Sequence, residues 1–310
     1  MGEALVQANT LLLIGGDLCI RTAHALDPQH WACIGLRRRP MNIPPDDDRI
    51  HWLQADLNRA DTLARALASP TAPGVITHLL YAPTPDVRTP EAYACAYPHG
   101  LQTLLAALPG ADQLQRGILV DSTAVWGPDT ADQEVNEDTP TCPEDFRGET
   151  MLQAEALLQA RLPGRGAALR LSGLYGPGRL RLVDDLRAGR ITAPDGPGHW
   201  ANRIHIDDAA RACAHLLSLT ALLPCYIGTD DHPLPTTVLY DTLAQIAGGP
   251  IPARADRPPD GRRLSNARLR ASGWVPRWSS AIDGYVASLD AGPPHRIHSP
   301  PCQTRPPPSN

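Results

Sequence analysis

The sequence predicts an α/β fold with a doubly wound, mainly parallel sheet and a small mixed C-terminal lobe. Two observations support this prediction. Between residues 11 and 176, short apolar runs alternate with stretches of helix-forming residues, which is the pattern of repeated βαβ units. The first apolar run ends directly in two glycines, as expected where a strand turns tightly into a helix.

The elements follow from this alternation in chain order. Strands are expected at residues 11–14, 32–36, 51–55, 75–81, 118–122, 167–172 and 225–228. Helices are expected after the first strand as far as residue 26 and at 61–68, 91–108, 149–160 and 236–247, with another starting at Asp207-Asp208. The helix at 91–108 contains Pro98, which removes a helical hydrogen bond and predicts a kink.

These elements divide the chain into three parts. Residues 10–176 form the expected first domain, and residues 177–290 form the C-terminal lobe. Segments near 203–228 are expected to return to the first domain. Residues 291–310 are rich in proline and lack periodicity, so we expect a disordered tail.

The composition excludes several classes of function. The net charge is −5, so no basic field would attract nucleic acid or an anionic membrane. All 28 basic residues are arginine and none is lysine, which excludes Schiff-base chemistry. The seven cysteines are scattered without a CxxC pair, so we expect neither disulfides nor a metal site. With no basic N-terminal signal segment, a cytoplasmic location is expected.

The glycine turn after the first strand is a candidate phosphate site. Gly15 and Gly16 would let the backbone approach a pyrophosphate at the positive end of the next helix. The motif is one residue short and has Cys19 at its last glycine position, so a plain tight turn is the alternative. Arg37 and Arg38 end the second strand, where an acid would hold a ribose hydroxyl. Arginine there favours the 2′-phosphate of NADP over NAD, unless the run is simply solvated.

Three later motifs add specificity. Residues 122–127 read Ser-Thr-Ala-Val-Trp-Gly, residues 169–179 contain Tyr-Gly-Pro-Gly-Arg, and residues 202–208 read Asn-Arg-Ile-His-Ile-Asp-Asp. With these motifs, residues 10–290 resemble the NAD(P)-dependent epimerase/dehydratase branch of the extended short-chain dehydrogenases, whose members resemble nucleoside-diphosphate-sugar epimerases. The resemblance implies a Rossmann-type fold and a sugar-like substrate. It also implies cofactor contacts from Gly15, Gly16, Asp17, Leu18, Arg21, Arg37, Arg38, Asp56, Leu57, Ala82 and Pro83.

The chain departs from this family at the catalytic helix. The family uses Tyr-x-x-x-Lys, in which tyrosine exchanges a proton while lysine lowers its pKa and holds the nicotinamide ribose. Aligned on Ala154 and Glu155, these positions fall on Arg147 and Met151. A guanidinium does not give up its proton at working pH, and a thioether carries no charge. The usual mechanism therefore cannot operate from this helix.

Three interpretations remain open. The first is an NAD(P)-dependent oxidoreductase or epimerase/dehydratase for a sugar-like or nucleotide-sugar substrate, with Ser122 orienting the substrate and Tyr175 or His205 exchanging the proton. Tyr81 is a further candidate for that exchange. The second is an NADP-binding sensor or scaffold without turnover. The third is an interaction protein that has lost its cofactor, given Cys19 and the short glycine turn.

The first interpretation is preferred, because the motifs around Ser122, Tyr175 and His205 would lie on the substrate side. A fold kept only to bind cofactor has less need of them. The resemblance also implies a homodimer formed through the helices at 91–108 and 149–160.

Overall fold

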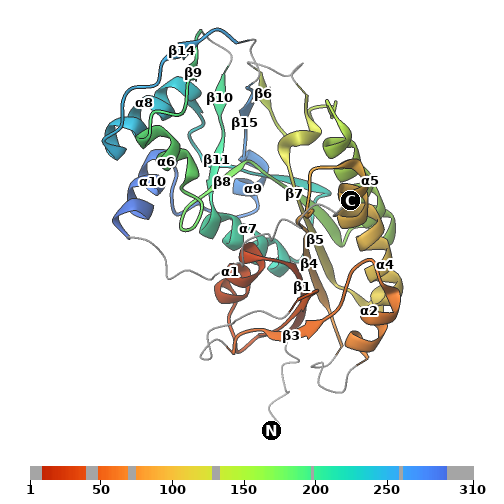
Figure 1. The fold of residues 1–310 in the computed structure, drawn as a ribbon. Coiled ribbons are helices and arrows are strands. Elements are labelled where there is room, and N and C mark those ends of the chain that lie inside the picture. The colour runs from red at the N-terminus through yellow and green to blue at the C-terminus, as the bar shows by residue number, and fades with distance from the viewer. Residues whose placement is uncertain are drawn as a thin grey trace, which may run out of the picture.

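A parallel sheet forms the centre of the molecule (Figure 1). The computed structural model describes residues 9–39, 48–68, 75–127, 133–196, 199–257 and 261–291. The strands of this sheet are β1 (Asn9–Gly15), β2 (Trp31–Arg37), β3 (His51–Gln54), β4 (His78–Ala82), β5 (Arg116–Ser122), β7 (Gly166–Leu171) and β12 (Cys225–Gly228). Their order is β12-β7-β5-β4-β1-β2-β3, and every neighbouring pair is parallel. The predicted doubly wound parallel sheet is confirmed.

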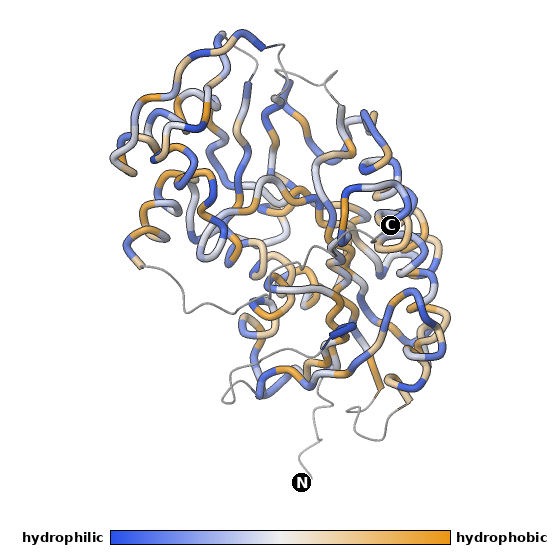
Figure 2. The backbone as a smooth tube through the Cα atoms, viewed as in Figure 1, coloured by the Kyte–Doolittle hydropathy of each residue, from blue (hydrophilic) through white to orange (hydrophobic). Residues whose placement is uncertain are grey.

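Helices cover both faces of the sheet, which explains why its central strands are buried along most of their length. Along β1, Leu11 and Leu13 belong to one buried cluster and Leu12 and Ile14 to another. The first cluster lies under α1 (Asp17–Ala25) and α7 (Ile206–Ser218), which pack against each other. The second lies under α2 (Ala60–Leu67), α4 (Gly100–Ala107) and α5 (Phe146–Arg161). Figure 2 shows the hydrophobic residues concentrated along the central strands.

The helix expected at 91–108 is interrupted at its proline. It divides into α3 (Pro90–Ala94), a π-helical turn (Cys95–His99) and α4, with Pro98 inside the π turn. The missing proline N–H breaks the regular hydrogen-bond pattern at this point. The Tyr81 hydroxyl, from the end of β4, donates to the Ala96 carbonyl in the turn.

A smaller lobe follows β7. It contains α6 (Arg181–Arg187), α8 (Thr236–Ala247) and α10 (Ala281–Asp290), which pack around a third buried cluster that includes Tyr175, Leu239 and Tyr285. Two-residue and three-residue strands complete the lobe: β8 (Gly173–Tyr175) beside β11 (Arg203–His205), β9 (Ala193–Pro194) beside β14 (Arg254–Ala255), and β10 (Trp200–Ala201) beside β13 (Leu234–Pro235).

The chain crosses between the two parts more than once. After β11 it returns to form α7 and then β12, the edge strand beside β7. The lobe lies beyond the carboxyl ends of the sheet strands (Figure 1). Apart from Ala291, the expected tail at 291–310 lies outside the described residues. Within the residues that the structure describes, no helix is both long and apolar enough to span a membrane.

Candidate functional site

The turn between β1 and α1 has the geometry of a phosphate site. Gly15 has φ +151°, and a Cβ there would lie 2.5 Å from the Ala82 carbonyl oxygen and 2.9 Å from the Cys19 sulfur. A Cβ on Gly16 would instead meet no atom within 4 Å, and no side chain caps the start of α1. An uncapped helix start beside open space fits the pyrophosphate of a dinucleotide. Cys19 is fully buried against the turn.

Charged side chains surround this turn. Asp17, in the first turn of α1, lies 2.9 Å from the Nε of Arg21 and 3.5 Å from the guanidinium of Arg179. Arg21 also pairs with Asp207 at the start of α7. The two guanidinium groups offset the Asp17 carboxylate, which would otherwise oppose a phosphate. The sequence analysis did not predict a role for Arg179 here, although the residue ends the Tyr-Gly-Pro-Gly-Arg motif.

The remaining predicted cofactor residues lie at the same edge of the sheet. Leu18 is buried in the first turn of α1, and Leu57 packs against the cluster on the opposite face. Asp56, after β3, accepts a hydrogen bond from the Asn58 amide. Ala82 ends β4 and is buried, and Pro83 follows it. The structure therefore brings this set of residues to the carboxyl ends of β1 and its neighbours.

The two predicted arginines at the end of β2 already have partners. The Arg37 guanidinium stacks over the Trp52 ring at 4.4 Å, and burial lowers the pKa of Arg37. The Arg38 guanidinium makes two hydrogen bonds of 2.6 and 2.8 Å to the Asp86 carboxylate. The Arg38–Asp86 pair lies at the surface, with the two side chains 48% and 65% exposed, so the preference for a 2′-phosphate and the alternative of a solvated run both stay predictions.

Ser122 ends β5 and faces α5, the helix that aligns with the Tyr-x-x-x-Lys segment of the family. Its Oγ accepts a hydrogen bond from the Ala124 amide at 3.2 Å and lies 3.6 Å from the sulfur of Met151 on α5. Gly148 lets α5 approach this closely, because a Cβ there would collide with the Ala124 carbonyl oxygen. The contact fits the alignment that puts Met151 at the family's lysine position, which stays a prediction.

Arg147, at the aligned tyrosine position, is held by its own helix cap. Asp145 accepts from the Arg147 amide at 2.8 Å and from the Arg147 Nε at 2.7 Å. This pairing raises the pKa of Arg147, mainly through the hydrogen bond to Asp145. Arg147 therefore stays a cation, and it offers no proton to exchange at this position.

Tyr175 lies in the core of the C-terminal lobe. Its side chain is fully buried, with the ring stacked on Tyr285 at 4.2 Å and edge-on to His205 at 5.2 Å. Gly284 leaves room for its hydroxyl, since a Cβ there would collide with that oxygen. Burial raises the pKa of Tyr175 far above its usual range. This geometry favours a packing role, and the proposed acid/base role is untested.

His205 caps the start of α7. Its Nδ1 accepts a hydrogen bond from the Asp207 amide at 3.2 Å, its Nε2 lies 3.2 Å from the Ser288 hydroxyl, and its ring packs on Trp278 at 3.8 Å. Burial lowers the pKa of His205 to about 4, so the ring is neutral at neutral pH. Both ring nitrogens already have partners. Proton exchange from His205 is likewise a prediction that the structure does not test.

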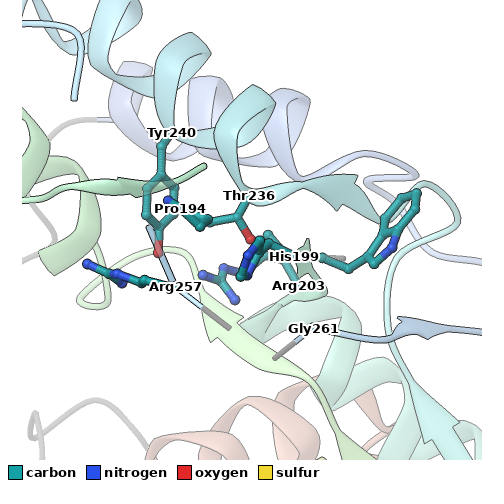
Figure 3. Close-up of a pocket in the computed structure, with 9 residues that line it drawn as sticks. Pro194, His199, Arg203, Thr236, Tyr240, Arg257 and Gly261 are labelled. Carbon is teal, nitrogen blue, oxygen red and sulfur yellow. The ribbon is translucent and has the colours of Figure 1, made fainter. Parts of the chain in front are cut away.

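A cavity of about 220 Å³ lies in the C-terminal lobe. Figure 3 shows the Tyr240 side chain extending from α8 toward Arg257, beside Arg203 of β11. The cavity is lined by Pro194, His199, Trp200, Ala201, Arg203, Thr236, Tyr240, Arg257 and Gly261. Two guanidinium groups, an imidazole and two hydroxyls suit an anionic, hydroxyl-bearing ligand. The sequence analysis missed this cavity because its lining comes from separate segments without a shared motif.

Metal binding has no support in the described part of the chain, where no three His, Cys, Asp or Glu side chains come together. The expected absence of a metal site stays a prediction for the whole chain.

A buried acid, Asp230, lies just beyond β12. It is 2% exposed, and burial raises its pKa from 3.8 to about 7. The folded chain therefore binds the proton of the Asp230 carboxyl group more tightly than the unfolded chain does. The stabilising contribution of the proton is complete below pH 4 and is lost as the pH rises through about 7.

Replacing Asp230 by asparagine should remove this pH dependence. Between pH 5 and pH 8, we expect the natural chain to lose about 1–3 kcal/mol of stability relative to Asp230→Asn. Urea unfolding at both pH values measures the difference. A constant difference between the two proteins would contradict the prediction.

Comparison with known proteins places these features in context. The profile of the NAD dependent epimerase/dehydratase family matches residues 20–222. Protein YeeZ of Escherichia coli K12 is 35% identical over 144 residues, which cover 44% of this chain and 48% of YeeZ. The chain thus matches about half the length of this curated relative.

Solved structures resemble nearly the whole chain. A Methylobacillus flagellatus protein described as an NAD-dependent epimerase/dehydratase has 34% identity and a TM-score of 0.74, covering 93% of this chain and 99% of its own. The Bordetella bronchiseptica enzyme WbmG, in complex with NAD and UDP, has 18% identity and a TM-score of 0.72. That match covers 91% of this chain and 94% of WbmG, and at this identity it shows the fold alone.

Proposed function

Because this chain belongs to the NAD dependent epimerase/dehydratase family, we propose that it is an NAD(P)-dependent oxidoreductase or epimerase/dehydratase acting on a sugar-like or nucleotide-sugar substrate. One observation supports this most directly. In the strand order, only β4 separates β5 from β1, so Ser122 at the end of β5 lies at the same edge of the sheet as the turn after β1. Ligands of open parallel sheets bind along this edge, where the strand order reverses.

The residues at the β1–α1 turn would hold the dinucleotide. Gly16 and the uncapped start of α1 would receive the pyrophosphate, and Arg37 and Arg38 support NADP as the preferred form, with NAD possible. When bound, the nicotinamide would supply or accept a hydride. Ser122 would orient the substrate hydroxyl through its Oγ, while Arg147 and Met151 leave proton exchange to another group.

The cavity with Arg203 and Arg257 would hold the substrate. WbmG binds UDP, and a diphosphate would match paired guanidinium groups here. Arg257 is exposed, so its replacement should leave the fold intact. We expect Arg257→Ala to weaken UDP binding about three- to tenfold. Calorimetry with UDP measures this, and Arg181→Ala, which changes an exposed arginine of α6 outside the cavity lining, is the control.

Binding without turnover is the second candidate function. It is favoured by the Arg147–Asp145 pair and by Met151 beside Ser122, because neither side chain can replace the tyrosine–lysine pair. This form of the protein would be an NADP-binding sensor or scaffold. The two candidates share the cofactor site and differ only in chemistry.

One experiment separates these functions. The purified protein is titrated with NADPH and NADH, and the oxidised form of the cofactor that binds is then supplied with a panel of nucleotide sugars. Reduction of the cofactor by hydride from a sugar, or conversion of a sugar to its epimer or dehydration product, supports an enzyme, and Tyr175→Phe and His205→Ala then test the proton donors. Binding with neither cofactor reduction nor a new sugar product supports the sensor. If neither cofactor binds, both proposals fail.

Two further features are part of this proposal. A cytoplasmic location fits the composition. A homodimer would use the helices predicted at 91–108 and 149–160, where α4 and α5 pack against one another in the structure. Sedimentation of the purified protein tests the dimer.

A further inference from the structure

An ion pair spans the carboxyl end of β1. Arg38 directly follows β2, and Asp86 lies in the segment after β4. These two strands flank β1 on either side, pairing with it at Leu36 and Ala82 near its end. The Arg38–Asp86 contact therefore joins the two neighbours of β1 above the turn at Gly15.

This position is where the strand order reverses, and ligands of such sheets lie in the crevice there. The end of β2 normally carries the group that reads the adenosine ribose: an acid for a free 2′-hydroxyl, or an arginine for a 2′-phosphate. Here both groups are present and bound to each other. Asp86 supplies the acid from a segment 48 residues after Arg38.

The Asp86 carboxylate binds the Arg38 guanidinium through two hydrogen bonds, the same bidentate geometry that a phosphate would use. The two hydrogen bonds measure 2.6 and 2.8 Å, and both side chains are about half exposed or more. An exposed pair of this kind is weak enough to be exchanged by a ligand. Asp56 adds a second negative charge near Arg38.

We propose that Asp86 is a specificity-determining residue that competes with the 2′-phosphate of NADP for Arg38. Binding of NADP exchanges one anionic partner of Arg38 for another, so part of the phosphate's binding energy goes into releasing Asp86. NAD has no 2′-phosphate and leaves the Arg38–Asp86 pair intact, so its affinity is not reduced in this way. Asp86 thereby reduces the difference in affinity between NADP and NAD that Arg38 provides. This inference rests on the proposed cofactor site.

The test measures binding and not turnover. The probes are NADPH, NADH and the fragments 2′,5′-ADP and 5′-ADP, titrated calorimetrically into the whole chain. We expect Asp86→Asn to bind NADPH and 2′,5′-ADP about two- to fivefold more tightly, with NADH and 5′-ADP nearly unchanged. Asp61→Asn is the matched control, since Asp61 is an exposed acid that pairs with Arg59 and Arg65 on α2.

A second variant makes the test specific to the pair. Arg38→Ala should weaken NADPH about tenfold while NADH changes little. In the Arg38→Ala background, Asp86→Asn should no longer change NADPH affinity beyond the small effect of removing a nearby charge, because its partner is gone.

The outcomes separate this inference from the proposed function. If the natural chain binds neither dinucleotide, the cofactor site and the inference both fail. If it binds them but Asp86→Asn changes neither affinity, only the competition is disproved. If Asp86→Asn weakens NADH, Asp86 holds the ribose hydroxyls instead, which also overturns the inference.

Discussion

Replacing Arg170 by methionine is expected to lower the free energy of unfolding by about 3–5 kcal/mol. Arg170 lies on β7 and makes hydrogen bonds of 2.8 and 2.7 Å to the Glu155 carboxylate on α5. Its guanidinium also stacks on Trp126 at 4.7 Å. The side chains of Arg170 and Glu155 are 6% and 13% exposed. Methionine keeps much of the volume but leaves a buried carboxylate without its cation.

A neighbouring acid makes this loss larger. Asp121 of β5 is buried beside Glu155, and burial followed by the Glu155 charge raises the pKa of Asp121 well above its usual range. Without Arg170, the Asp121 and Glu155 carboxyl groups would lie side by side in the core with no cation between them. Because acid removes buried negative charge, the destabilisation should shrink as the pH falls.

Urea unfolding at two pH values measures this effect. Adding Glu155→Gln to Arg170→Met removes one of the uncompensated charges and should recover part of the loss. Arg254→Met, which breaks an ion pair with Asp241 on the surface, should change stability far less. A core variant that unfolds at the same urea concentration as the natural chain would disprove the prediction.

The two glycines of the β1–α1 turn are expected to respond in opposite ways. Gly15→Ala should lower the free energy of unfolding by about 2–4 kcal/mol, because its Cβ would press on the Ala82 carbonyl at a φ that favours glycine. Gly16→Ala meets open space, so it should disturb the fold much less. Its methyl group would instead occupy room proposed for the pyrophosphate, and we expect at least a tenfold loss of dinucleotide affinity.

Thermal unfolding and dinucleotide titration of both variants check this contrast. Gly164→Ala serves as a control for a glycine with positive φ at a loop remote from the turn, where the new Cβ would contact nothing. If Gly16→Ala binds dinucleotide as well as the natural chain does, the phosphate does not lie at this turn. If Gly15→Ala is as stable as the natural chain, β1 can move away from the Ala82 carbonyl of β4 at little cost, and the stability prediction is wrong.

The fold could be predicted because its signal is local. The strand expected at 11–14 lies within β1, and the kink expected at Pro98 coincides with the π-helical turn. Apolar runs and proline act on their immediate neighbours, so one sequence is enough to locate them. The family motifs likewise put Ser122 at the end of β5.

The contacts that decide the chemistry depend on distant segments. Asp86 reaches Arg38 across β1, so the ionic partner of this arginine comes from a loop 48 residues away in the sequence. Tyr175 and His205 lie within motifs, yet they are covered by Tyr285 and Trp278 from the end of the described chain. A local motif carries no information about partners that come from distant segments of the chain.

The contacts of Arg21 also have a consequence for biosynthesis. Asp17 pairs with Arg21 within one turn of α1, but Asp207 comes 186 residues after Arg21. Arg179, the second partner of Asp17, also lies late in the chain. While a ribosome is still making the first half, α1 has neither α7 to pack against nor these late ionic partners. The nascent chain therefore emerges with α1 not yet packed against α7. We expect chaperones to protect this part of the chain until residues beyond 207 have left the exit tunnel.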